Sequence, residues 1–340
     1  MANKASYTGN PMPLAITRIA SDRNMVMNDK EGYASSDIYF DFDKKKINTG
    51  FKILMIGSQD LSNPYMGGFF MFSGNYPDQY PFFPPHMQAM TQGKNTRFHP
   101  NFYVSGKCCV SILGTWSGPP WTSCQNMGTV AQTLKSLYIE NPITQEPGWE
   151  DCTDCRSKIY KRIVEYRTLE IAVLQMLHSP PKGYEVFLPI MEQEFLKFWT
   201  KYSKKLDDLS NYDGKKYVSP IYNMEVIFDI KGLKANFNNT YKILQNKYKI
   251  NLNNEEKKCE ETVNTIPSDK STEKLDNLLV ENNKNKKNTN TTSSKKSTRK
   301  CPNDMAKKFE IGTKKLSEND NSIWIVKEKK NNTKYWVKII

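Results

Sequence analysis

An asparagine and a cysteine in segment 97–116 have the types and spacing needed for acyl transfer. Asn101 precedes Cys109 by eight residues. A cysteine thiolate attacks thioester carbonyls, and this attack builds an oxyanion that a positioned amide can stabilise. A loop of this length can return the Asn101 amide to the flank of the Cys109 thiol. The pair therefore indicates thioester chemistry, with Cys109 as the acceptor and Asn101 as the oxyanion donor.

His99 and Pro100 form a stiff turn before Asn101. Pro100 fixes its own φ and restricts the residue before it, and an imidazole inside the turn can hold the loop by hydrogen bonds. We therefore expect His99 and Pro100 to support Asn101 rather than to act as bases. An alternative stays open, because free cysteine is among the most buried residue types and Cys108 shows that the segment accepts cysteine as a small hydrophobic residue.

The segment and its surroundings resemble the ubiquitin-conjugating enzymes, class E2. In that family an HPN turn precedes a Gly-x-(Ile/Val)-Cys-Leu step and an Ile-Leu pair, which places the acceptor at Cys109. The similar motifs, in order, are YPFFPP at 80–85, the HPN-to-cysteine segment at 99–113, a tryptophan loop at 121–124 and a gate loop that begins at 141. Segments 65–70, 112–121 and 140–150 further resemble the large Z-type members. The likeness runs from about residue 12 to about residue 249.

The resemblance implies roles for further residues and partners. Glu146, with Asp151 as a second choice, is the gate-loop acid that orients the incoming lysine and helps it lose a proton. Phe82, Thr122 and Ser123 face ubiquitin ligases, and Arg18 and Arg23 lie on the helix that meets the activating enzyme. The implied partners are ubiquitin or a similar modifier, the activating enzyme, a ligase and protein substrates. ATP is used by the activating enzyme, so no cofactor and no metal is expected in this chain.

Two departures from the family pattern stand out. Cys108 occupies a position that is usually aliphatic, so it is a candidate second acceptor or oxidation partner, although adjacent strand residues point to opposite faces. Ser123 replaces the usual proline of the tryptophan loop, which concerns ligase choice rather than catalysis.

Cys152 and Cys155 form a Cys-x-x-Cys pair. A structural zinc site needs four ligands, and neither a second pair nor a nearby histidine supplies them. A thioredoxin-like centre needs a preceding βαβ pattern, which the sequence lacks. The favoured interpretation is a pair of surface thiols.

Seven cysteines without disulfide-framework spacing indicate a reducing compartment. We find no secretory leader and no apolar run of the roughly 18 residues that span a bilayer. The expected location is therefore intracellular, in cytoplasm or nucleus, without membrane partners. If the chain is viral, the expected location is the host cytoplasm or the virion.

Hydrophobic periodicity predicts an α+β, UBC-like fold around the site. The expected helices are 14–27, 129–139, 156–177 and 192–202, and the expected antiparallel strands are 38–42, 51–56, 69–72 and 86–90. A short apolar element and a Lys-rich helix are expected between 223 and 251. The predicted domains are a catalytic core at 12–178, a helical extension packed on it at 179–250, a disordered basic linker at 251–304 and a β-hairpin module at 305–340.

The C-terminal part of the sequence suggests roles of its own. Segment 282–300 contains seven Lys or Arg and no acid, which suits either a weak anionic partner or a solubilising tether. Runs 309–312, 323–327 and 335–340 predict the β module, which resembles modules in large DNA virus proteins; the Asn/Lys bias fits an AT-rich viral genome. Two rival functions follow: a non-catalytic ubiquitin-conjugating-like scaffold, and a nucleic-acid or virion tether that acts through the tail.

Overall fold

The computed structural model describes residues 5–42, 50–263, 314–316, 323–328 and 334–338. The chain divides into two compact units, residues 1–266 and 267–340. The first unit contains all the predicted site residues.

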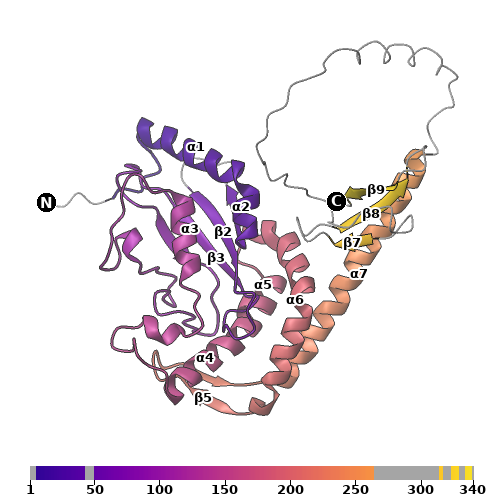
Figure 1. The fold of residues 1–340 in the computed structure, drawn as a ribbon. Coiled ribbons are helices and arrows are strands. Elements are labelled where there is room, and N and C mark those ends of the chain that lie inside the picture. The colour runs from indigo at the N-terminus through magenta and orange to yellow at the C-terminus, as the bar shows by residue number, and fades with distance from the viewer. Residues whose placement is uncertain (1–4, 43–49, 264–313, 317–322, 329–333, 339–340) are drawn as a thin grey trace, which may run out of the picture. The chain divides into compact units, whose positions relative to one another are not determined.

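A helix and an antiparallel meander open the first unit (Figure 1). The elements are α1 (Pro13–Asn28), α2 (Lys30–Ser35), β1 (Ile38–Phe42), β2 (Gly50–Ile56), β3 (Phe69–Asn75) and β4 (His86–Ala89). The strands pair in the order β1-β2-β3-β4, with Ile53 opposite both Phe40 and Phe72. Such β-branched and aromatic residues favour strands because they pack well on a pleated surface. The predicted α+β fold, with its opening helix and meander, is confirmed.

Helices follow the meander and cover the sheet. They are the 3-10 turns η1 (Ser111–Leu113) and η2 (Pro142–Gln145), α3 (Met127–Ser136), α4 (Cys155–Arg167), the π-helical stretch η3 (Thr168–Gln175) and α5 (Met176–His178). The α3 helix lies against the sheet, where Met127 Sδ accepts a 3.3 Å hydrogen bond from the Tyr76 hydroxyl. Asn126 caps α3 and Asp154 caps α4 by accepting backbone N–H groups. The predicted helix 156–177 is thus an α-helix that becomes π-helical before its last turn.

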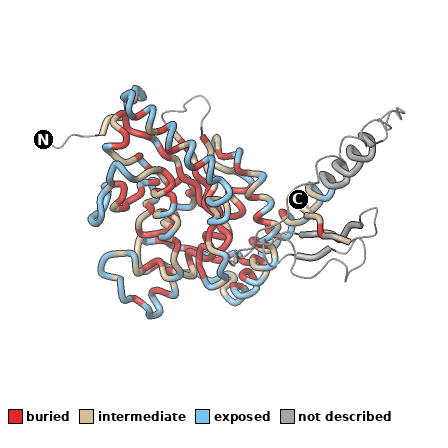
Figure 2. Tube along the Cα trace, turned by 45° about the horizontal axis from the view of Figure 1, so that its top comes forward, coloured by how far each residue is buried: buried red, intermediate tan, exposed pale blue. Residues whose placement is uncertain are grey.

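The region after α5 folds back on this core. Its elements are η4 (Glu185–Phe187), α6 (Leu188–Asp208), η5 (Ser210–Tyr212), β5 (Lys216–Val218), β6 (Glu225–Ile227) and α7 (Ile230–Val263). The Tyr202 hydroxyl of α6 donates to Gly67 O at 2.7 Å, and its ring packs on Phe237 of α7. Residues of α6 and α7 belong to the same buried hydrophobic cluster as the sheet, and Figure 2 shows buried positions running from the sheet into these helices.

Several elements differ from the sequence predictions. The α2 helix, the β5 strand and its pairing with β6 were not predicted. The β6 strand and the start of α7 lie where a short apolar element and a Lys-rich helix were expected. Disorder was predicted from residue 251, but α7 continues to Val263. The physical reason is that helix propagation costs little once a helix has formed, and the sequence has neither Gly nor Pro between Gly232 and Pro267 to stop it. The predicted disorder of 264–304 lies outside the described residues.

The second unit contains an antiparallel sheet in the order β7-β8-β9. Its strands are β7 (Lys314–Leu316), β8 (Ile323–Glu328) and β9 (Lys334–Lys338), with Ile325 opposite Val337. The last two agree with the predicted strands. The predicted run 309–312 lies outside the described residues, and the strand that pairs with β8 is found at 314–316.

Candidate active site

The HPN turn follows β4 and is held from inside by His99. The Asn101 backbone N–H donates to His99 Nδ1 at 3.1 Å. The His99 ring has no exposed surface and lies among Tyr65, Phe102 and Tyr138. Burial lowers the pKa of His99 to about 3, so the ring is neutral near pH 7. This environment suits a structural support and leaves no charged imidazole to act as an acid.

Asn101 and Cys109 are hydrogen-bonded to each other in both directions. The Cys109 backbone N–H donates to Asn101 O at 2.8 Å, and Asn101 Nδ2 donates to Cys109 O at 2.7 Å. The loop thus brings the side-chain amide to the cysteine, as the spacing predicted. In this arrangement the amide is occupied by the Cys109 carbonyl, so it must turn from that carbonyl to reach an oxyanion on the thiol side.

The two adjacent thiols have different surroundings. Cys108 is 2% exposed and belongs to the hydrophobic cluster, whereas Cys109 lies outside that cluster, although it is only 5% exposed. Burial raises the pKa of the Cys108 thiol to about 12, so it stays protonated near pH 7 and is a poor nucleophile. Cys109 Sγ instead points to the loop that follows and donates to Thr115 O at 2.9 Å.

Thr115 closes the loop around Cys109 and was not singled out from the sequence. Its Oγ1 accepts from the Val110 backbone N–H at 2.9 Å and lies 2.9 Å from Cys108 O, to which it can donate. Gly114 reverses the chain just before it, with a φ of +67° that favours glycine. The Gly-Thr step that follows Cys109 at 114–115 is the sequence signal from which this contact could have been found.

The predicted ligase-facing residues share one exposed surface. Phe82 is 62% exposed, and Thr122 and Ser123 are also exposed. Trp121 Nε1 donates to Pro81 O at 2.7 Å, which joins the tryptophan loop to the turn that carries Phe82.

The two arginines of α1 make contacts within the fold. Arg18 Nε lies 2.7 Å from the buried carboxylate of Asp22, and Arg18 Nη1 donates to Ser123 O at 2.5 Å. The Arg18 side chain therefore ties α1 to the tryptophan loop. Arg23 lies over the Phe42 ring, 4.7 Å from its centroid.

Glu146, the predicted gate-loop acid, is half-buried and follows η2. Its Oε2 accepts a 2.5 Å hydrogen bond from the hydroxyl of Tyr222, a residue of the extension that sequence reasoning missed. Asp151, the second choice, is exposed.

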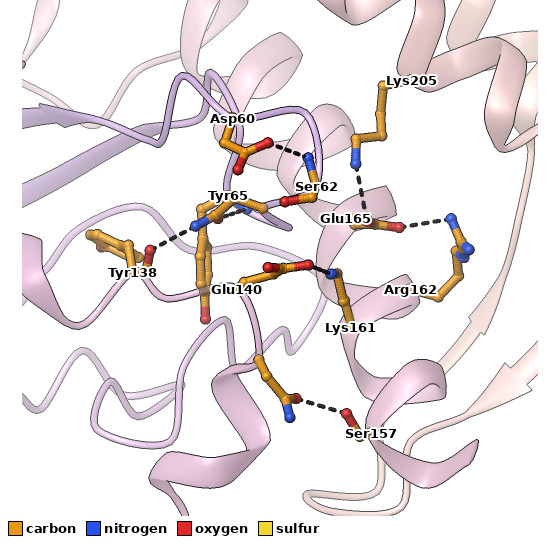
Figure 3. A network of polar contacts seen from close by, with 12 residues as sticks. Asp60, Ser62, Tyr65, Tyr138, Glu140, Ser157, Lys161, Arg162, Glu165 and Lys205 are labelled. Carbon is orange, nitrogen blue, oxygen red and sulfur yellow. Dashed lines mark hydrogen bonds and ion pairs between the residues drawn. The ribbon is translucent and has the colours of Figure 1, made fainter. Parts of the chain in front are cut away.

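The start of the gate region is anchored to α4 (Figure 3). The Ser157 hydroxyl donates to Asn141 Oδ1 at 2.7 Å, and Lys161 pairs with Glu140 at 2.7 Å. One turn further along α4, Glu165 pairs with Lys205 of α6 at 3.0 Å. The gate loop is therefore positioned by α4, and α4 is in turn linked to the extension.

The Cys-x-x-Cys pair has no metal-binding surroundings. Within the described residues, no group of three or more His, Cys, Asp or Glu side chains could hold an ion. Cys155 is exposed, but Cys152 is buried, with its Sγ 3.6 Å from Asp154 Oδ1. The prediction of two surface thiols is therefore wrong for Cys152, because the turn before α4 folds this side chain into the core.

In the part of the chain that the structure describes, no helix combines the length and apolar character needed to cross a bilayer.

The fold and the site together define a ubiquitin-conjugating domain. Residues 18–167 match the family model described as ubiquitin-conjugating enzyme. The similarity of the chain to the Z-type members is confirmed. The chain is 34% identical over 200 residues to ubiquitin-conjugating enzyme E2 Z of Xenopus tropicalis, covering 58% of this chain and 64% of that protein. It is 36% identical over 184 residues to E2 Z of Homo sapiens, covering 54% and 52%.

A viral relative is also similar. A probable ubiquitin-conjugating enzyme of Acanthamoeba polyphaga mimivirus is 32% identical over 161 residues, covering 44% of this chain and 11% of that protein. This match is consistent with the viral source suggested by the sequence. The chain spans between about half and two thirds of the length of the E2 Z relatives described above.

Proposed function

We propose that this chain accepts ubiquitin, or a ubiquitin-like modifier, as a thioester on Cys109 and transfers it to lysine amines of protein substrates. The observation that supports this most is the mutual hydrogen bonding of Asn101 and Cys109 beside a Cys108 thiol that stays protonated in the core. The match of residues 18–167 to the ubiquitin-conjugating enzyme model supports this reaction class.

The proposed reaction has two acyl transfers. In the first, the Cys109 thiolate attacks the modifier's thioester on the activating enzyme, and the thiolate of that enzyme leaves. In the second, a lysine amine attacks the Cys109 thioester, the Asn101 amide stabilises the oxyanion, and the Cys109 thiolate leaves. Glu146 orients the amine and accepts its proton.

The proposed partners follow from the surfaces around the site. The activating enzyme meets α1 and consumes the ATP, so no cofactor takes part in the step on this chain. A ligase contacts the surface of Phe82, Thr122 and Ser123. Because Cys109 must remain a free thiol, we place the activity in a reducing intracellular compartment. The basic segment 282–300 is retained as a candidate for a weak anionic contact.

A charging assay tests the proposal. The protein is incubated with an activating enzyme, ATP and ubiquitin or another modifier, and the adduct is resolved with and without a reducing agent. A reducible adduct should form on the wild type and on Cys108→Ala and should be lost in Cys109→Ala. The proposal fails if neither cysteine carries the modifier or if Cys108 alone does; the first outcome is the one expected of a non-catalytic scaffold.

A further inference from the structure

The tip of the β5–β6 hairpin reaches from the extension to the HPN turn. Its backbone turns through two residues with positive φ, Tyr222 at +66° and Asn223 at +52°, and is closed by a 2.8 Å hydrogen bond from the Ser219 N–H to Met224 O. Met224 Sδ accepts from the Arg97 backbone N–H at 3.3 Å. The hairpin tip therefore contacts the chain two residues before the HPN turn.

Arg97 connects this tip to the catalytic loop. Its guanidinium lies between two tyrosine rings, 3.9 Å from the centroid of Tyr222 and 4.0 Å from that of Tyr103. The same group donates from Nη2 to Pro100 O at 2.5 Å. Stacking on both faces and a hydrogen bond at the edge leave the guanidinium little freedom, so the ring of Tyr222 has a fixed position relative to Pro100.

Tyr222 also contacts the gate loop. Its hydroxyl donates to Glu146 Oε2 at 2.5 Å, and its ring packs edge to face on Tyr160 of α4, 6.1 Å between centroids. Burial, followed by the bond to Glu146, raises the pKa of Tyr222, so the phenol remains a hydrogen-bond donor throughout the physiological range. One side chain of the extension thus touches both loops that the proposed reaction uses.

We propose that Tyr222 is a positioning residue that holds the Glu146 carboxylate for the incoming lysine, so that the extension completes the active site. Tyr222 occupies Oε2 and leaves Oε1 to receive the amine. A glutamate in a loop has several rotatable bonds, and fixing it in advance removes an entropic cost from the transition state. This inference rests on the proposed thioester function and adds to it a role for a residue outside the conjugating core.

Replacing Tyr222 by phenylalanine tests the hydroxyl while keeping the ring on Arg97. Tyr248→Phe is the matched control, because the Tyr248 hydroxyl also binds a glutamate, Glu192 Oε2 at 3.0 Å, between α7 and α6. The assay loads each protein with modifier, then follows loss of the Cys109 adduct to free lysine and, separately, to hydroxylamine. Hydroxylamine is already neutral at pH 7, so it does not need the Glu146 carboxylate to remove a proton before attack.

We expect Tyr222→Phe to charge at the wild-type rate within about twofold and to lose its adduct to lysine about 10-fold more slowly. The slower discharge is a part of the roughly 10²-fold rate enhancement that a positioned acid or base contributes. Discharge to hydroxylamine should change by less than about twofold. In a Glu146→Gln background, Tyr222→Phe should have no further effect on lysine discharge, since the two side chains act as one unit. Tyr248→Phe should match the wild type in every assay.

Three outcomes would overturn the inference while the proposed function stands. The first is lysine discharge by Tyr222→Phe at the wild-type rate. The second is an equal slowing of discharge to lysine and to hydroxylamine. The third is additive effects of Tyr222→Phe and Glu146→Gln on lysine discharge. If the wild type forms no reducible adduct at all, the proposed function fails and the inference falls with it.

Discussion

At the residue scale, small differences in surroundings separate side chains of the same type. Cys108 and Cys109 are neighbours, yet only Cys108 belongs to the hydrophobic cluster, where burial raises its pKa. The Asn101 amide is bound to the backbone carbonyl of Cys109, the proposed acceptor. The chemistry of the site therefore depends on which groups each side chain meets rather than on the residue types alone.

Asn101→Ala should spare charging and slow lysine transfer by about 10² to 10³-fold, the usual cost of losing an oxyanion donor. Asn126→Ala is the control for lost local structure, because Asn126 caps α3 by accepting from the Thr129 N–H at 3.0 Å. The control should lose about 1 kcal/mol of stability and keep its transfer rate. Single-turnover discharge of the loaded enzyme compares the transfer rates of both variants with that of the wild type. Equal transfer by Asn101→Ala and the wild type would remove the proposed role.

His99 should make stability depend on pH. Its pKa in the folded state is about 3, below the ordinary value of 6.5, so the unfolded chain binds a proton that the folded chain rejects. The stability from this neutral ring is fully present above pH 6.5 and is lost as pH falls from 6.5 toward 3. Between pH 6.5 and 5 the loss is about 2 kcal/mol, from 1.36 kcal/mol per pH unit.

Urea unfolding of wild type and His99→Asn at several pH values measures this contribution. His99→Asn should be less stable at pH 7, but its stability should fall less steeply between pH 6.5 and 5 because no proton uptake by residue 99 remains. Parallel pH dependence in the two proteins would contradict the assignment.

The sequence predicted the centre of the site but not its contact with the extension. Asn101 and Cys109 lie eight residues apart within one loop, so local spacing was enough to pair them. The Tyr222–Glu146 bond joins residues 76 apart in sequence. No periodic pattern marks either partner, and the contact depends on how a short hairpin packs against the gate loop. Such pairings follow from tertiary packing, which local sequence patterns do not encode.

At the element scale, the opening helix and most strands of the meander were predicted best. Strands 38–42 and 86–90 and helix 14–27 match β1, β4 and α1 to within a residue at each end. The strands β5 and β6 have three residues each, too few to show alternation, and α2 has six. The α7 helix extends past its predicted end, because the sequence has neither Gly nor Pro between Gly232 and Pro267 to stop it.

The α4–α6 contact predicts an asymmetry between two substitutions. Glu165 is 5% exposed and lies between Lys205, which is 8% exposed, and the more accessible Arg162 (Figure 3). Glu165→Leu leaves the buried ammonium of Lys205 without its partner and should cost about 3 kcal/mol or more. Lys205→Met leaves Glu165 paired with Arg162, so we expect less than half of that loss.

Chemical denaturation followed by circular dichroism compares the two variants. Lys216→Met serves as the control, because the pair of Lys216 with Glu225 joins side chains that are 54% and 60% exposed, and such exposed pairs contribute little. Equal destabilisation by Glu165→Leu and Lys205→Met would show that the ion pair with Arg162 does not stabilise the Glu165 carboxylate once Lys205 is replaced.

At the scale of the whole molecule, the hydrophobic cluster of the sheet continues into the extension. Tyr166 of α4 stacks on Phe228 at 4.6 Å between centroids, and Trp199 of α6 stacks on Tyr241 of α7 at 4.0 Å. These contacts bury large aromatic surfaces on both sides. The extension is therefore part of the folding unit that contains the active site, in addition to its contact through Tyr222.

Two truncations distinguish the parts of the chain that the site needs. The described contacts of the catalytic residues lie within residues 5–263, so a chain that ends at Val263 should charge Cys109 within about twofold of the full-length rate. A chain that ends at Asp213 loses the buried side chains of Phe228, Ile230, Leu233, Phe237 and Leu244. At about 2 kcal/mol for each, their loss removes about 10 kcal/mol, which is comparable to the whole stability of a typical domain.

The chain that ends at Asp213 should therefore be unfolded at 25 °C or precipitate, and it should form no thioester. Thermal unfolding monitored by circular dichroism, together with the charging assay, measures both expectations. Cooperative unfolding and normal charging of this shorter chain would show that residues 5–213 fold alone, and that the extension serves the active site only through the hairpin contact with Glu146 and Arg97. Loss of charging on cutting at Val263 would instead place a needed element in residues 264–340.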